Sequence, residues 1–246
     1  MAKAEKHISN LSDSLPVTAP ASRKMPECVG IIMDGNRRWA RERGLPTFAG
    51  YHAGYEKLKQ VARFAREAGV HTLIVYTFSM ENWKRPEKEL KKLFSLFELA
   101  LREGMHEIQK EHFAIRFIGE RSRFPLKLQK RMEHIEAETP DVSQGLMAIA
   151  VSYGGRSDIV RAVRTLQKKN EPVTEASISN ALDTATMPNP ELIIRTGGQR
   201  RLSNFLPWES IYSELYFSDS FWPDFSKEEF LVALRTFAGA QRNFGA

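Results

Sequence analysis

Short apolar runs alternate with amphipathic stretches from about residue 27 to the end of the chain, and no other feature constrains the fold as much. The apolar runs predict buried strands at 28–33, 72–78, 113–118, 146–151, 192–194 and 215–217. Between them, apolar residues recur at helical spacing over 55–65, 90–108, 126–135, 158–166 and 230–237. Strands that alternate with helices predict an α/β fold, namely a single domain with a central, mostly parallel six-stranded sheet flanked by helices.

Two helix starts are predicted from particular residues. Pro86 is placed to begin a long helix that continues to Ile108, because a proline at a helix start loses no hydrogen bond. Ser226 and Glu229 have the spacing of a capping box, in which each side chain bonds the backbone N–H of the other.

Length and charge limit the class of protein without identifying its partner. The 246 residues suffice for one sizeable core, and we expect a folded domain at 25–246 behind a disordered tail at 1–24 that is rich in Ser, Ala, Pro and charges. The net charge of +6 favours anionic partners but does not separate nucleic acid, anionic lipid and diphosphates. The single cysteine, Cys28, suits a reducing compartment, and no segment resembles a signal peptide or a membrane span. We therefore expect a cytoplasmic protein whose membrane contact is peripheral.

The first polar loop follows the strand predicted at 28–33. Asp34, Gly35 and Asn36 lead there into a helix start, whose N–H groups and dipole favour anions, and Gly35 lets a ligand approach the backbone. Arg37 and Arg38 add cationic donors. A carboxylate among so many anion-binding groups makes sense if a divalent metal joins Asp34 to phosphate oxygens. A plain N-cap aspartate followed by surface arginines would give the same pattern.

The second polar loop follows the strand predicted at 72–78. Ser79 and Asn82 offer short hydrogen-bonding groups, Arg85 offers a bidentate fork for phosphate, and Trp83 offers a flat apolar wall. A helix-capping loop with a packed tryptophan is the alternative interpretation.

The third polar loop follows the strand predicted at 192–194. Arg195, Arg200, Arg201 and Ser203 surround a Gly-Gly turn, which predicts a second anion site, although a solvated basic loop would look the same. Because ligands of parallel sheets bind at the carboxyl ends of the strands, the three loops are expected to meet at one edge. Two anion sites beside Asp34 suggest two diphosphates that meet at a metal.

Several common sites are missing from the sequence. It contains no G-x-x-x-x-G-K-[ST] motif of P-loop nucleotidases and no G-x-G-x-x-G dinucleotide motif. It also lacks the DDxxD aspartates of trans-prenyltransferases, and its six histidines lack zinc-ligand spacing.

The chain resembles the cis-prenyltransferase family, whose bacterial type is undecaprenyl diphosphate synthase, from about Glu27 to Ala246. The resemblance rests on motifs that occur in the family's order at 31–40, 78–86, 151–156, 194–198, 201–205, 214–217 and 222–225. It implies a cis-prenyltransferase catalytic domain that condenses isopentenyl diphosphate with an allylic diphosphate, with farnesyl diphosphate as the expected primer. It further implies Mg²⁺ as cofactor, Z double bonds in an undecaprenyl-type lipid carrier, a homodimer, and no nucleic-acid partner.

The resemblance also implies roles for individual residues. By position, Asp34 would hold the metal and help release the allylic diphosphate, Asn82 would serve proton removal, and Glu214 would be a second metal carboxylate. Arg200 stands at the position next to the metal, although a guanidinium is no metal ligand. The implied substrate-binding residues are Gly35, Asn36, Arg37, Arg38, Trp39, Thr47, Tyr51, Ser79, Met80, Glu81, Trp83, Arg85, Arg195, Arg201, Leu202, Ser203 and Arg242.

The sequence departs from the family mainly on the side of the allylic substrate. Arg37 replaces a frequent glycine, Thr47 a frequent arginine, and Tyr51 stands where a Gly-His pair is usual, with His52 shifted by one place. Gln199 and Arg200 replace a frequent Glu and His. The resulting hypothesis is that Arg37 supplies the cation missing at Thr47.

Product length should depend on how much apolar tunnel the helices enclose. The helix face with Leu93, Phe94, Phe97 and Leu101, together with Thr77 on the second strand, is the candidate for its wall, and plain core packing is the alternative use of the helix face. Three alternatives stay open: a synthase of short or irregular prenyl products, a non-catalytic partner subunit, and a basic nucleic-acid-binding domain. The last lacks any recognised module.

Overall fold

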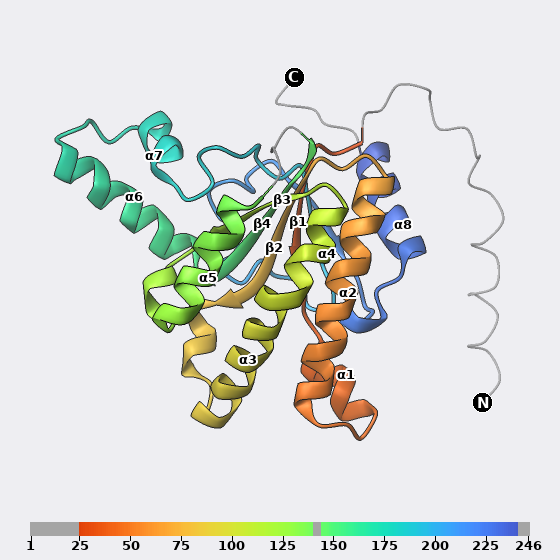
Figure 1. Ribbon diagram of the computed structural model, residues 1–246. Helices are drawn as coiled ribbons and strands as arrows, with labels where there is room; N and C mark the ends of the chain where they lie inside the picture. The colour runs from red at the N-terminus through yellow and green to blue at the C-terminus, as the bar shows by residue number, and fades with distance from the viewer. Residues whose placement is uncertain (1–24, 140–143, 241–246) are drawn as a thin grey trace, which may run out of the picture.

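Six parallel strands form one sheet at the centre of the protein, as the computed structural model shows for residues 25–139 and 144–240 (Figure 1). Their order across the sheet is β3-β4-β2-β1-β5-β6, and every neighbouring pair is parallel. This confirms the predicted fold class, with a sheet that is entirely rather than mostly parallel. The strands are β1 (Cys28–Ile32), β2 (Thr72–Ser79), β3 (Ala114–Ile118), β4 (Leu146–Tyr153), β5 (Leu192–Arg195) and β6 (Glu214–Phe217).

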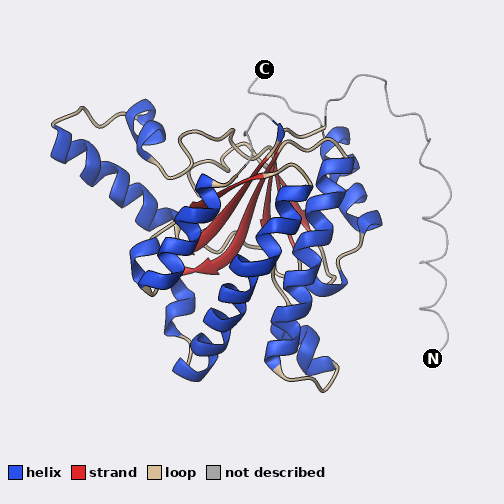
Figure 2. Cartoon of the chain, in the orientation of Figure 1, coloured by secondary structure: helices blue, strands red, loops and turns tan. Residues whose placement is uncertain are grey.

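Helices connect the strands and cover the sheet, and in Figure 2 most of them stand in front of it. They are α1 (Asn36–Glu42), α2 (Thr47–Glu67), α3 (Glu87–Leu99), α4 (Met105–Lys110), α5 (Leu126–Ala137), α6 (Gly155–Lys169), α7 (Glu175–Ala181) and α8 (Lys227–Gly239). Short turns add η1 (Met80–Lys84), η2 (Ala100–Gly104), η3 (Arg121–Arg123) and η5 (Trp222–Asp224). In the part of the chain that the structure describes, no helix is both long and apolar enough to cross a bilayer.

Alternate residues of each strand point to opposite faces of the sheet, and both faces are buried. Val29 and Ile31 of β1 join the larger core, under α2, α4, α5 and α8. Cys28 and Ile32 face the smaller core on the other side, where Tyr76 stacks on Phe205 from the loop after β5, at 4.8 Å between ring centroids. Continuous apolar runs therefore appear in strands β1 to β5 because both of their faces are covered, whereas the edge strand β6 stays partly exposed.

The predicted helical stretch from Pro86 to Ile108 is confirmed as uninterrupted, but one turn within it is π-helical rather than α-helical. Pro86 is the N-cap of α3, and the π-helical turn η2 joins α3 directly to α4. The apolar spacing continues through η2 because all three segments pack on the same core. The capping box at α8 is only half formed. The Ser226 hydroxyl accepts the Glu229 N–H at 3.1 Å, but the Glu229 carboxylate instead accepts a bond from the Ser218 hydroxyl at 2.6 Å.

The order of the strands reverses at β1. The chain passes from β1 to β2 on one side, whereas β5 and β6 lie on the other. Ligands of such sheets bind at the carboxyl ends of the strands, next to this switch point. Since Ile32 pairs with Arg195, the loop after β1 and the loop after β5 lie side by side there.

Candidate functional site

Asp34 lies at the switch point and is held by groups from both neighbouring loops. Its Oδ1 accepts the Gly35 N–H at 2.6 Å and lies 3.2 Å from Arg38, while its Oδ2 accepts a bond from Arg195 at 2.8 Å. Thr196 fixes the backbone: its hydroxyl accepts the Asp34 N–H at 3.0 Å and donates to the Asp34 carbonyl at 2.8 Å. The carboxylate is 31% exposed, so a ligand can still reach it.

The electrostatics of Asp34 keep it ionised. Burial raises the pKa of this carboxyl, but the Arg195 hydrogen bond, the charges of Arg195 and Arg38, and the Gly35 N–H together outweigh burial and lower the pKa below its usual range. Asp34 is therefore an anion at neutral pH, surrounded by donors that also suit phosphate oxygens.

Arg195 connects Asp34 to the loop after β5. Its guanidinium is only 4% exposed and donates to Ser203 Oγ at 2.8 Å and to the Arg201 carbonyl. Its Nε–H is buried and has no hydrogen-bond partner among the residues that the structure describes. Ser203 itself has φ +50, so the loop is bent sharply at the point where the two side chains meet. This strained backbone conformation places the Ser203 hydroxyl next to the Arg195 guanidinium.

Two glycines make the close approach of these loops possible. At Gly35, with φ +108, an added Cβ would lie 2.7 Å from the Phe221 ring. At Gly197, with φ +83, a Cβ would lie 2.7 Å from the Arg38 guanidinium. Both positions combine a left-handed backbone with a lack of space, so side chains are excluded there.

The second polar loop is joined to the other two. Asn204 donates to Glu81 Oε1 at 3.3 Å, and the Asn82 amide oxygen accepts the Ser79 N–H at 3.1 Å. The Met80 sulfur lies 3.3 Å from the Ser152 hydroxyl. The prediction that three loops converge at one sheet edge is thus met in the structure: Asp34, the loop after β5 and η1 form one chain of contacts.

A network of charged and polar groups lies between α2 and α3. The Tyr51 hydroxyl donates to Glu89 at 2.6 Å and accepts from Arg85 at 2.8 Å, and Arg85 lies 3.3 Å from the same carboxylate. The exposed Arg37 reaches Glu89 at 3.8 Å. Thr47 lines the neighbouring surface hollow with Tyr51 and Glu89. Arg37 and Thr47 therefore lie on the same side of the site, as the hypothesis about the missing cation requires.

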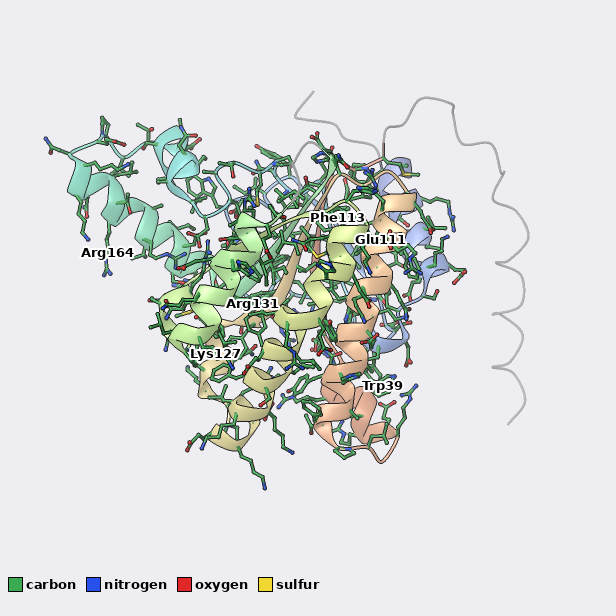
Figure 3. The ribbon with its side chains drawn as sticks, in the orientation of Figure 1. Trp39, Glu111, Phe113, Lys127, Arg131 and Arg164 are labelled. Carbon is green, nitrogen blue, oxygen red and sulfur yellow. The ribbon has the colours of Figure 1, made fainter. Side chains whose placement is uncertain are left out.

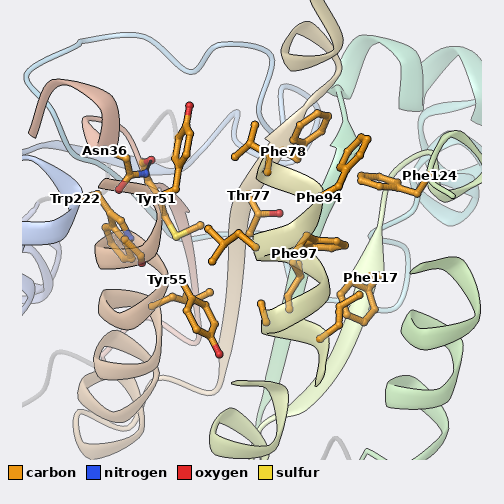
Figure 4. A pocket seen from close by; sticks show the side chains of 18 residues that line it. Asn36, Tyr51, Tyr55, Thr77, Phe78, Phe94, Phe97, Phe117, Phe124 and Trp222 are labelled. Atoms are coloured by element: carbon orange, nitrogen blue, oxygen red, sulfur yellow. Dashed lines mark hydrogen bonds between the residues drawn. The ribbon is translucent and has the colours of Figure 1, made fainter. Parts of the chain in front are cut away.

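An apolar cavity of about 130 Å³ lies between α2, α3 and the sheet (Figure 4). Its lining includes Met33 and Asn36, on either side of the Asp34 loop, as well as Phe97, Leu101 and Phe117. Leu93, Phe94 and Thr77 also line it, so each of the five residues predicted for the wall does so. A cavity of about 150 Å³ holds one benzene ring, so this one has room for roughly one five-carbon unit.

Some predicted substrate residues lie elsewhere than expected. Trp39 does not line the cavity: its indole N–H donates to Asp224 at 2.7 Å and its ring stacks under Arg43. Trp83 also packs outside it, against Phe78, and donates to Ser152 Oγ at 2.8 Å.

The residues of the third loop divide by burial. Leu202 packs on the smaller core, whereas Arg200 and Arg201 are exposed, and the Arg201 guanidinium donates to Gln199 at 2.6 Å. Arg242 lies outside the described residues.

Glu214 is placed away from Asp34. It is the first residue of β6 and pairs with Leu192, at the amino end of the strands, whereas Asp34 follows the carboxyl end of β1. Within residues 25–139 and 144–240, no three His, Cys, Asp or Glu side chains gather to form a metal cage. One ionised carboxylate among phosphate-binding donors nevertheless fits Mg²⁺, which proteins commonly bind through one or two carboxylates plus substrate phosphates. Within a single chain, Asp34 fits this mode and Glu214 does not.

Phe221 and Glu89 belong to the site but were not found from the sequence. Phe221 packs on Gly35 and lies under Arg38 at 5.3 Å, although the chain separates it from both by more than 180 residues. Glu89 stands four residues after Arg85, a spacing that could have paired the two in the sequence, but its contact with Tyr51 could not have been foreseen. Phe221 carries no local signal, because only the tertiary fold brings it to Gly35 and Arg38.

A second polar cluster is buried behind the loop after β5. Arg161 reaches Asp158 at 3.0 Å and Asp183 at 2.6 Å, and Thr184 donates to Glu209 at 2.5 Å. Burial and the charge of Asp183 raise the pKa of Asp158 to about 7, although Arg161 opposes this. The folded protein therefore holds a proton at Asp158 that the unfolded chain releases at about pH 4.

We expect Asp158→Asn to remove one component of the pH dependence of stability. Because the pKa is higher in the folded state, the free energy of unfolding falls as pH rises from about 4 to about 7, by up to about 1.4 kcal/mol per pH unit, and then levels off. The variant has no titrating group at this position. The difference in free energy of unfolding between variant and wild type, measured by urea unfolding, should therefore change between about pH 4 and about pH 7. Glu133→Gln, at an exposed position of α5, should run parallel to the wild type. A constant difference for Asp158→Asn would contradict the expectation.

The sequence matches the model of one protein family, described as undecaprenyl diphosphate synthase, over residues 32–245. The isoprenyl transferase of Aquifex pyrophilus is 47% identical over 225 residues, which cover 91% of this chain and 97% of that protein. The ditrans,polycis-undecaprenyl-diphosphate synthase of Pseudomonas putida, named as specific for (2E,6E)-farnesyl diphosphate, is 42% identical and is covered over 92% of both chains.

Solved structures show the same relationship. Lavandulyl diphosphate synthase from Lavandula x intermedia, in complex with dimethylallyl diphosphate, superposes with a TM-score of 0.84 at 33% identity, over 90% of this chain and 99% of that chain. A probable undecaprenyl diphosphate synthase from Campylobacter jejuni superposes with a TM-score of 0.77 at 29% identity, over 91% and 100% of the two chains.

Proposed function

This chain belongs to the undecaprenyl diphosphate synthase family of prenyltransferases, and on that basis we propose that it extends farnesyl diphosphate with isopentenyl diphosphate to a long Z-polyprenyl diphosphate, the lipid carrier of cell-wall synthesis. The observation that carries the proposal is the ionised Asp34, held between Arg38 and Arg195 beside the opening of an apolar cavity. Such a site combines side chains that can bind a diphosphate with an apolar cavity that can hold a hydrocarbon chain.

We assign the allylic diphosphate to the loop after β1. The first helical bond of α1 runs from the Trp39 N–H to the Gly35 carbonyl, so the N–H groups before it are available to phosphate oxygens. Arg38 adds a cation, and the prenyl chain would extend past Met33 into the cavity. Mg²⁺ bound to Asp34 and the diphosphate would neutralise the charge that develops on the leaving group.

We assign the isopentenyl diphosphate to Arg195, Arg201 and Ser203. Arg195 is buried and oriented by three partners, which is the preorganisation that stabilises developing charge well. Asn82 is fixed by the Ser79 N–H and would orient the proton that leaves when the new double bond forms. A neutral amide is a poor base, so we assign the acceptance of that proton to the released diphosphate.

Product analysis tests the function. Purified protein with Mg²⁺ and labelled isopentenyl diphosphate should yield long polyprenyl products from farnesyl diphosphate, resolved by chromatography after removal of phosphate. The structural similarity to lavandulyl diphosphate synthase supports a second candidate, an irregular C10 product from dimethylallyl diphosphate. The primer that is consumed and the length of the product separate the two. A folded protein that converts neither primer would refute both.

Arg37 gives a sharper test of the allylic side. We propose that it replaces the cation missing at Thr47, so Arg37→Ala should raise the KM for the allylic primer about tenfold, since one charged hydrogen bond contributes roughly 1.5 kcal/mol. The KM for isopentenyl diphosphate should not change. Arg43→Ala is the control, because Arg43 is an exposed arginine that pairs with Asp224 instead. An unchanged allylic KM in Arg37→Ala would rule out this role.

We further propose a cytoplasmic homodimer. The edge strand β6 and the residues before it expose Ile211, Tyr212 and Leu215, three large apolar side chains that a second copy of the chain could cover. The family resemblance assigns Glu214 to the metal, but Glu214 lies at the amino end of β6, away from Asp34 of its own chain. If Glu214 does bind the metal, it must therefore do so at a different site.

A further inference from the structure

A cationic hollow of about 470 Å³ lies between the end of α3 and α5, outside the site described above. Its polar lining consists of Arg102, Lys127, Lys130, Arg131 and His134, with Glu98 as the acid. Lys127 pairs with Glu98, and Arg102 pairs with Glu103 at 2.7 Å. Those two pairs leave the charges of Lys130 and Arg131 in excess, so the hollow favours an anion.

The helical spacing of α5 explains why the cations gather on one side. Residues 127, 130, 131 and 134 follow the i, i+3, i+4, i+7 pattern of a single helix face, whereas Leu128, Met132 and Ile135 are buried in the core. Figure 3 shows Lys127 and Arg131 on α5, next to α3. The Lys127 side chain is 77% exposed, so the cationic face is open to a partner.

The hollow adjoins the wall of the apolar cavity. Arg131 donates to the carbonyl of Leu101 at 3.3 Å, and the Leu101 side chain lines the cavity from the inner side. Phe124, two residues before α5, lines the same cavity. The cations and part of the cavity wall are therefore carried by the same segments, η2 and the start of α5.

One large apolar side chain stands at the margin of the cationic face. Leu126 is 64% exposed at the start of α5, one turn from Lys130. An exposed leucine among basic residues is the composition of surfaces that rest on anionic bilayers, with cations at the phosphates and the apolar side chain in the interface.

We propose that this face of α5 and the end of α3 docks the enzyme on a bilayer of anionic phospholipid. Lipid phosphate would occupy the hollow at Lys127, Lys130 and Arg131, and Leu126 would enter the headgroup region. The proposal rests on the proposed function, because a polyprenyl product needs an apolar phase to leave into. The docked face would place the cavity wall, and hence the growing hydrocarbon, next to that phase.

Vesicle binding tests the proposal with the full-length protein. We expect sedimentation with vesicles of phosphatidylglycerol and phosphatidylcholine but not with phosphatidylcholine alone, and loss of binding at high salt. Lys127→Gln/Lys130→Gln should weaken binding roughly 25-fold, since each basic residue near an anionic surface contributes about fivefold. Lys168→Gln/Lys169→Gln is the control, because it removes the same charge from exposed positions at the end of α6. Leu126→Ser should weaken binding without changing its salt dependence.

Each outcome decides the proposal separately from the function. Equal losses in the two double variants would show attraction to the net charge alone and would overturn the docking surface. Competition by inorganic phosphate at millimolar concentration would show an ion site rather than a bilayer surface, and would overturn it as well. Prenyl transfer from soluble substrates in detergent is measured in parallel. If the double variant loses vesicle binding but the wild type makes no product, the proposed prenyl transfer is refuted, whereas the proposed membrane-docking surface is supported.

Discussion

Asp34→Asn should lower kcat/KM for prenyl transfer by about 10³-fold. The amide has the size of the carboxylate but no charge, so it cannot hold a divalent metal against two diphosphates. It also leaves Arg38 and Arg195 without their counter-ion. Loss of a single preorganised charge-stabilising group commonly costs 10²–10³-fold in rate, and here metal binding is lost in addition.

The fold of Asp34→Asn is expected to survive. The carboxylate is 31% exposed, and the amide oxygen can still accept from Arg195, so no buried charge is left without a bond. Circular dichroism and the unfolding midpoint check this. Asp224→Asn is the matched control, because Asp224 is also a partly exposed carboxylate beside an arginine, Arg43, and should retain activity. Activity in Asp34→Asn within tenfold of the wild type would refute the assigned role.

Arg195→Lys should raise the KM for isopentenyl diphosphate about 10²-fold while the KM for the allylic primer changes little. Arg195 reaches Asp34, Ser203 and the Arg201 carbonyl at once through a planar fork, and a lysine ammonium cannot keep that geometry while it also binds phosphate. The loss of one or two charge-assisted bonds, at roughly 1.5–3 kcal/mol each, gives the expected magnitude.

Arg201→Lys gives a graded comparison, because Arg201 is assigned to the same diphosphate as Arg195 but is exposed. The Arg201 guanidinium is exposed and pairs with Gln199, so the change should cost tenfold or less. Steady-state kinetics with one substrate varied at a time separate the two KM values. Equal increases in both values for Arg195→Lys would place the arginine at a position common to the two diphosphates.

Most of the fold was predictable from the sequence because both faces of the sheet are buried. Buried parallel strands leave continuous apolar runs such as 146–151, and the helices between them keep one apolar face each. The π-helical turn at Ala100–Gly104 within the predicted long helix was not predictable, since apolar residues on both sides of it pack on the same core. Neither was α7, whose residues carry no apolar periodicity and whose side chains are not buried.

The candidate site was partly predictable for a different reason. The carboxyl ends of parallel strands share one edge, so Asp34 and Arg195 were expected to meet, and they do. The rule does not apply to Glu214, which lies at the beginning of its strand. The family resemblance alone assigned Glu214 to the metal, and its pairing with Leu192 places it at the opposite end of the strands from Asp34.

The sequence by itself determined the class of fold, the family, and which loops carry the ionised and cationic groups, because these follow from local patterns along the chain. Only the tertiary structure decided which of those groups meet. Arg195 is buried against Asp34 and Ser203, Glu89 takes up Arg85 and Tyr51, and Phe221 closes over Gly35. The contacts of Arg195 with Asp34, of Glu89 with Tyr51 and of Phe221 with Gly35 join segments far apart in the chain, and their geometry depends on strand order and helix packing, which no local pattern encodes.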